Sequence, residues 1–104
     1  MPWRGTWLTG WHNDRADGVC GVALSGTRKS IDAFWRRIRA QASSLEAELP
    51  DGATVEPGRF GIAIVRPNSQ FHDDDERRAW IVSNMNRFAD VLRPRMKALV
   101  EKQH

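Results

Sequence analysis

The chain has 104 residues, of which 40% are hydrophobic and 28% are charged, and its formal net charge is +3. This length and composition are typical of one globular domain, spanning residues 1–104. The single cysteine, Cys20, excludes an intramolecular disulfide, and neither an apolar run of membrane-spanning length nor a signal-peptide pattern is present. We therefore expect a cytoplasmic protein that does not enter the membrane.

Three tryptophans, Trp3, Trp7 and Trp11, stand four residues apart near the start of the chain, which has five Trp and no Tyr. This spacing suits a helix face or a strand face, but the intervening glycines and threonines favour a strand over Trp3–His12. The opposite face of that strand carries the polar residues Arg4, Thr6 and His12. We therefore expect the Trp face to meet the helices, with Trp7 in the core.

A hairpin is predicted next, because residues 13–18 are rich in turn formers and lead into a second strand, Val19–Ser25. Side chains alternate along a strand, so Cys20, Val22 and Leu24 share one face, and smaller residues share the other. The larger apolar face of each strand is expected to meet the helices.

Ser30 is predicted to cap the N-terminus of an amphipathic helix. The apolar residues after it follow helical spacing: Ile31, Phe34, Trp35, Ile38, Ala42, Leu45 and Leu49. The sequence Pro-Asp-Gly at residues 50–52 then stops the chain from continuing as a helix, so one helix is expected up to Leu49.

The second half begins with a short extended segment over residues 53–56 and a strand over residues 59–66. The interior residues of that strand lack charge on both faces, which is typical of the centre of a sheet. Residues 67–71 are predicted to form a loop.

A second helix is predicted from Asp73, because its acidic first turn suits the positive end of the helix dipole. Its buried stripe would consist of Ile81, Met85, Phe88, Leu92, Met96 and Leu99, with Trp80 beside it. Pro94 falls inside this pattern and removes a backbone donor, so we expect a kink or break near Arg93.

The predicted order of elements is strand, strand, helix, strand, strand, helix. Hairpins with helices laid on one side form a two-layer α+β sandwich. The expected architecture is therefore ββαββα, with a four-stranded, mostly antiparallel sheet and two long helices on one face.

Residues 18–100 resemble a prokaryotic family known as domain of unknown function 4268. The resemblance lies in the strand that ends in Arg66-Pro67, and in the closing pattern Phe-x-x-Val-Leu-x-Pro-Arg-x-Lys-x-Leu of residues 88–99. Members are often the C-terminal module of proteins that begin with a restriction-nuclease-like domain. The resemblance therefore implies a nucleic-acid-processing or defence context, and it implies no catalytic residues. At 104 residues, this chain is expected to act without a nuclease domain.

Two groups of residues, each containing cations, are candidate sites for phosphate. One lies where a strand joins a helix N-terminus, whose amides and dipole favour anions, and consists of Arg28, Lys29 and Ser30. The other lies on the helix itself and consists of Arg36, Arg37 and Arg39. It would merge with cations of the last helix if the two helices lie side by side. For the first group the favoured alternative is a solvated loop with a serine cap, and for the second an ordinary solvated helix face explains the arginines equally well.

The sheet face turned away from the helices is a candidate interface. Alternation places small and apolar residues on it, and those expected to contact a partner are Thr6, Leu8, Val19, Ala23, Ala63 and Val65. A smooth apolar face left in water would need a cover, such as a second copy of the sheet or another protein. The alternative is a different pairing of the strands.

Catalytic and metal chemistry find little support in the residues. His72 and the acids after it could supply metal ligands, but helix capping explains the acids better. Glu56 is followed by Pro-Gly, so the PD-(D/E)xK nuclease pattern is absent, and Cys20 is expected to be a buried structural thiol. We expect no enzyme activity, no metal, no cofactor and no small-molecule substrate.

The sequence thus predicts a small non-catalytic binding module in a bacterial or phage defence context, acting on nucleic acid or a nucleoprotein. The alternative is a protein–protein interaction module, which would form a homodimer through the sheet face or inhibit a partner protein.

Overall fold

The computed structural model describes residues 5–13, 18–56 and 61–101, with side chains as far as residue 98. The strands are β1 (Thr6–His12), β2 (Val19–Gly26), β3 (Thr54–Val55) and β4 (Ile62–Pro67). The helices are α1 (Arg28–Ile38), α2 (Ala42–Glu48) and α3 (Asp74–Glu101), with short 3₁₀ turns at Arg39–Gln41 and Asn68–Gln70. Trp3, Arg4, Arg59 and Phe60, which the sequence places in strands, lie outside the described residues.

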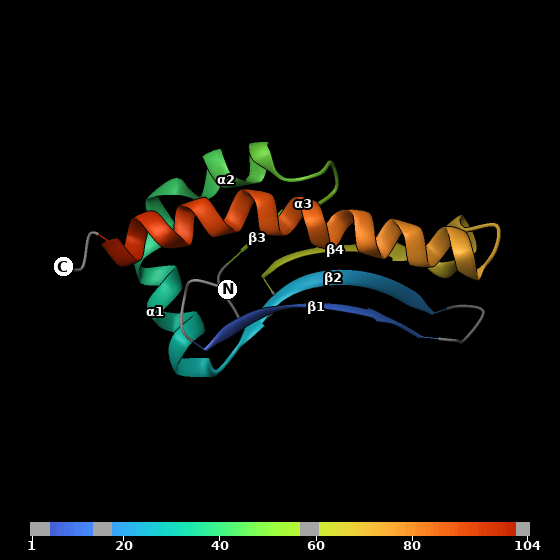
Figure 1. The fold of residues 1–104 in the computed structure, drawn as a ribbon, viewed down its shortest axis with the longest axis horizontal. Helices are drawn as coiled ribbons and strands as arrows, with labels where there is room; N and C mark the ends of the chain where they lie inside the picture. Colours follow the sequence, from blue (N-terminus) through green and yellow to red (C-terminus); the bar gives the residue numbers. More distant parts are fainter. Residues whose placement is uncertain (1–4, 14–17, 57–60, 102–104) are drawn as a thin grey trace.

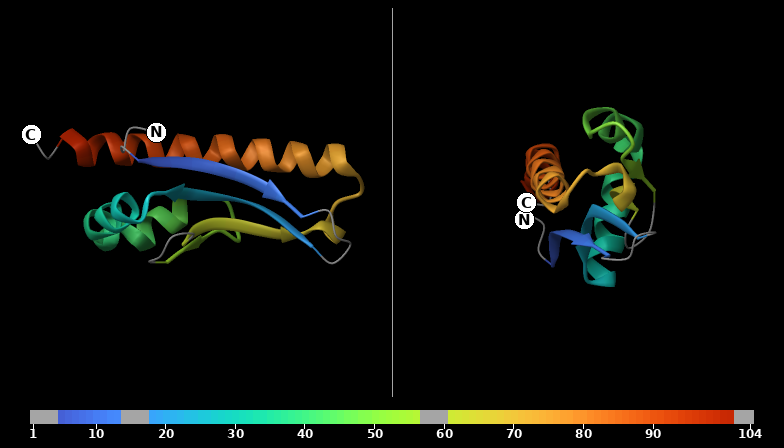
Figure 2. Two further views of the ribbon diagram at one scale, coloured as in Figure 1. Left: turned by 90° about the horizontal axis from the view of Figure 1, so that it is seen from below. Right: turned by 90° about the vertical axis from the view of Figure 1, so that its right-hand side faces the viewer.

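The four strands form one sheet in the order β1-β2-β4-β3, and every neighbouring pair is antiparallel. In Figure 1, α3 runs along the upper side of the sheet, and α2 lies on the same side. The right-hand view of Figure 2 shows the same layering end-on. The predicted α+β fold with a four-stranded antiparallel sheet is therefore confirmed.

The hydrophobic core lies between the sheet and the helices. Alternate residues of the two central strands point into it, and so do the apolar stripes of the helices. Its most completely buried large side chains include Val22, Ile62, Ile64, Phe34, Ile38, Leu45, Phe88, Leu92 and Met96. The helical spacing seen in the sequence thus identified the packed faces of α1, α2 and α3 correctly.

The first predicted helix starts earlier than expected and is not continuous. Thr27, rather than Ser30, is the N-cap, and its hydroxyl oxygen accepts a hydrogen bond from the Ser30 backbone amide at 3.2 Å. The helix then passes through the 3₁₀ turn at Arg39–Gln41 before α2 begins. Because the chain changes direction there, α1 stands at the end of the sheet while α2 lies on the side of α3 (Figure 1).

The break predicted near Arg93 is absent, since α3 is one helix of 28 residues with Pro94 inside it. Proline at this position leaves the carbonyl oxygen of Asp90 without its helical donor. Both residues lie on the exposed side of α3, where water can donate to that oxygen. At the other end of α3, the Asp73 carboxylate accepts a hydrogen bond from the Glu76 amide at 2.8 Å, so the predicted capping role of the acids is confirmed.

Arg95 ties α3 to the segment that carries α2. Its guanidinium donates to the Gln41 side chain at 2.7 Å, to the Ser44 hydroxyl at 3.1 Å and, through Nε, to the Glu48 carboxylate at 2.8 Å. A second nitrogen of the same group also contacts Glu48. The sequence led us to expect that cations of the last helix join a basic patch, and the structure instead assigns one of them, Arg95, to an interhelical clamp.

Replacing Arg95 by alanine should therefore lower the free energy of unfolding by about 1–2 kcal/mol. The half-exposed Glu48 limits the contribution of the ion pair, and the substitution also removes the hydrogen bonds that the largely buried guanidinium donates to Gln41 and Ser44. Urea denaturation measures the change, and Arg93→Ala, on the exposed side of α3, is the matched control. Equal stability of the two variants would show that the clamp contributes nothing.

Candidate functional site

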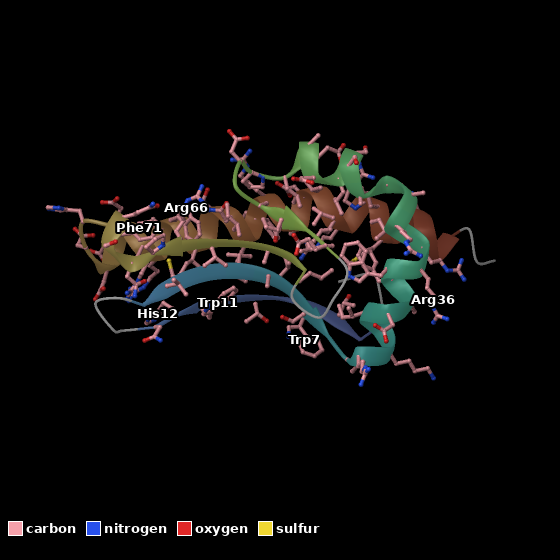
Figure 3. All side chains as sticks on the ribbon, turned by 180° about the vertical axis from the view of Figure 1, so that it is seen from behind. Trp7, Trp11, His12, Arg36, Arg66 and Phe71 are labelled. Carbon is pink, nitrogen blue, oxygen red and sulfur yellow. The ribbon has the colours of Figure 1, made fainter. Side chains whose placement is uncertain are left out.

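The sheet face opposite α3 carries the tryptophans of β1. In the β1–β2 pairing, Trp7 stands opposite Ser25 and Trp11 stands opposite Gly21, and directly opposed residues share a face. Figure 3 shows both indoles below the sheet, on the side away from α3. Trp7 is 48% exposed, so the prediction that it belongs to the core is wrong. We call this surface the open face.

The other face of β1 meets the helices. Thr6 is buried and Leu8 packs against the core, so these two members of the predicted interface were placed on the wrong side of the sheet. Side-chain polarity was a poor guide in β1, because both of its faces hold apolar residues. The pairing register with β2 is the observation that places Trp7 and Trp11 on the correct face of the sheet.

The remaining members of the predicted interface lie on the open face. Val19 and Val65 are exposed there, while Ala23 and Ala63 oppose each other across β2 and β4 and are covered by their neighbours. Within the described chain, no helix crosses in front of β1, β2 and β4 in the left-hand view of Figure 2, which is taken from below.

Trp11 lies across the sheet because position 21 is glycine. A Cβ atom built on Gly21 would come within 2.7 Å of Cη2 of the Trp11 ring and within 2.6 Å of the Ile64 carbonyl oxygen. Any side chain at this position would therefore displace the indole. Trp11 is half-buried, and it forms one wall of an open hollow of about 460 Å³ on this face.

The first turn of α1 flanks the open face at the end where Trp7 lies. Arg28 and Lys29 are exposed and follow Gly26, whose partner in β1 is Thr6. Figure 1 shows α1 beginning below the sheet, on the side opposite α3, and rising past the sheet's end. Neither cation forms an ion pair or a side-chain hydrogen bond with the described residues.

The other predicted phosphate contacts are more dispersed. Arg36 points away from the sheet in Figure 3, and Arg37 and Arg39 are also exposed. The Ser30 amide already donates to Thr27, so it is not an open anion donor. The structure thus places the start of α1, with the exposed Arg28 and Lys29, at the end of the sheet where Trp7 lies, and it does not merge the cations of α1 with Arg95 of α3.

Other reactive groups are held in structural roles. The Cys20 thiol is fully buried in β2. Burial raises its pKa above the ordinary value of 9.0, although the charge of Arg77 acts in the opposite direction. The nucleophilic thiolate is therefore disfavoured. Among the described residues, no three His, Cys, Asp or Glu side chains are grouped as metal ligands.

No helix among the described residues is long and apolar enough to cross a membrane.

Comparison of the chain with protein-family models, with curated proteins and with solved structures found no match.

Proposed function

We propose that this protein is a binding module for single-stranded nucleic acid, and that the open face is its contact surface. The observation that carries the proposal is the position of Trp7 and Trp11 on a sheet face that no described helix covers, near the cations that begin α1. The resemblance of residues 18–100 adds a bacterial or phage defence context, with free nucleic acid or a nucleoprotein as the target.

Unpaired bases suit this surface better than a duplex does. A base stacked on an aromatic side chain contributes about 1–3 kcal/mol, and duplex bases hide the faces needed for this contact. Trp7 and Trp11 are four residues apart on an extended strand, so their Cα atoms are about 13 Å apart. The two rings are too distant to sandwich one base, and each therefore contacts a base of its own.

The cations of α1 would neutralise the phosphates that join these bases. Each phosphate contact on a single strand contributes about −0.7 to the slope of log affinity against log salt concentration. Replacing both Arg28 and Lys29 by glutamine should therefore make that slope about 1.4 less steep. Fluorescence anisotropy of a labelled oligothymidylate, titrated at several salt concentrations, measures it.

The matched control replaces two exposed cations of α3, Arg93 and Lys97, by glutamine, which changes the net charge equally. The proposal requires that this control keep the wild-type slope. Equal salt-dependence slopes for the two double variants would mean that the attraction between protein and oligomer depends on net charge alone. Absence of binding to the oligomer at low salt would contradict the proposed function itself.

The exposed apolar residues Val19 and Val65 support a second candidate, homodimerisation through the same face. Sedimentation velocity at micromolar concentration tests it. A dimer that Val65→Lys converts to a monomer would favour this candidate, whereas a monomer in both cases would contradict it.

A further inference from the structure

The hollow beside Trp11 has a definite chemical lining. Six residues of three strands form it: Thr9, Trp11, Ala23, Ser25, Ala63 and Val65. Its volume of about 460 Å³ falls within the range of small-molecule sites. The directly paired Ala23 and Ala63 keep it open, because larger side chains at these two positions would fill it.

Thr9 and Ser25 both bring a hydroxyl group to this hollow, and Ser25 is the more deeply buried of the two. The residue is only 6% exposed, and it lies on the open face opposite Trp7. No hydrogen bond joins its hydroxyl to another described residue, and water can reach the hydroxyl oxygen from the hollow. A hydrogen-bonding ligand in the hollow would replace that water, whereas an apolar ligand would leave the hydroxyl without a partner.

We propose that the hollow is a nucleobase subsite, in which the base packs against the Trp11 indole and hydrogen-bonds through its polar edge to the Ser25 hydroxyl. The inference rests on the proposed function and names the part of the ligand that this site takes. Ala23 and Ala63 line the hollow, and their small side chains leave room for the base.

Two features favour a base over an apolar side chain of a protein partner. An apolar side chain would complete the burial of the Ser25 hydroxyl without giving it a hydrogen bond, whereas every base has donors or acceptors on its edge. In addition, Arg28 and Lys29 follow Ser25 closely in the chain and stand at the same end of the sheet. Their charge complements the phosphates attached to a base in this position.

The test compares two probes with equal numbers of phosphates. One is a labelled oligothymidylate, and the other has the same length but lacks bases at its central nucleotides. We expect the wild-type protein to prefer the thymidylate. Ser25→Ala should weaken binding of the thymidylate about threefold to tenfold, as expected for one lost hydrogen bond, and leave the abasic probe unaffected.

A second variant, Ala63→Leu, fills the hollow and should reduce the preference for the thymidylate at least as strongly. The control is Val19→Leu, which enlarges an exposed apolar side chain on the same face, outside the residues that line the hollow. Ser25→Ala changes the volume little, so the test stands even if Ala63→Leu fails to fold.

The outcomes separate the subsite from the proposed function. If the wild type prefers the thymidylate and Ser25→Ala keeps the full preference and affinity, the subsite is wrong and the function stands. If the wild type binds neither probe, the proposed function fails and the subsite fails with it. If Ala63→Leu or Val65→Lys changes only self-association, the hollow belongs to a dimer interface instead.

Discussion

Replacing Trp7 and Trp11 together by alanine should weaken binding of single-stranded DNA by at least about 30-fold. The estimate takes the lower limit of about 1 kcal/mol for each of two stacked bases. The phosphate contacts of α1 remain in this variant, so its residual binding should keep the salt dependence of the wild type. Anisotropy titrations at two salt concentrations measure both quantities.

Stability measurements provide the control for this result. Trp7 is about half exposed, so Trp7→Ala should lower the free energy of unfolding by less than about 1 kcal/mol, compared with about 3–5 kcal/mol for a tryptophan in a core. Unchanged binding by the double variant would remove the tryptophans from the contact surface. A loss of stability near 3 kcal/mol in Trp7→Ala would contradict the exposed position of this side chain.

Replacing Phe88 by alanine should lower the free energy of unfolding by about 3–5 kcal/mol. Phe88 is fully buried where α3 meets the sheet, and its removal loses the transfer free energy of the ring and leaves a cavity. Small domains are stable by only about 5–15 kcal/mol, so this change alone brings the protein close to unfolding. The shift in the midpoint of urea denaturation reports it.

Val82 provides the matched position on the same helix, because its side chain is 52% exposed. Val82→Ala should change the free energy of unfolding by no more than about 0.5 kcal/mol. Similar destabilisation by the two substitutions would mean that α3 does not pack on the sheet through the face that contains Phe88.

Periodicity in the sequence predicted the secondary structure of this protein well. The spacing of Phe34 and Ile38 identified the buried face of α1, and that of Phe88 and Leu92 identified the buried face of α3. These stripes are local properties, because a helix places residues three or four apart on one side whatever it packs against. Turn-forming residues between the predicted strands are also a local signal. They indicated strands joined by short turns, and the four-stranded antiparallel sheet agrees with that prediction.

The direction change between α1 and α2 was not predictable from these patterns. Residues 39–41 contain neither glycine nor proline, and the apolar stripe stays in phase from Ile38 to Leu45. Contacts distant in the sequence accompany the turn, since Arg95 of α3 bonds to Gln41 and Glu48. Helix propensity contains no information about such a clamp.

The sequence by itself determined that Trp7 and Trp11 share one face of one strand, and only the tertiary structure decided which face that is. The physical reason lies at Gly10, where α3 approaches β1 closely. A Cβ atom at Gly10 would come within 2.7 Å of Ile81 and 2.9 Å of Met85. An indole on that side of β1 would hold the helix away from the sheet, so the glycine face meets α3 and the tryptophan face remains open.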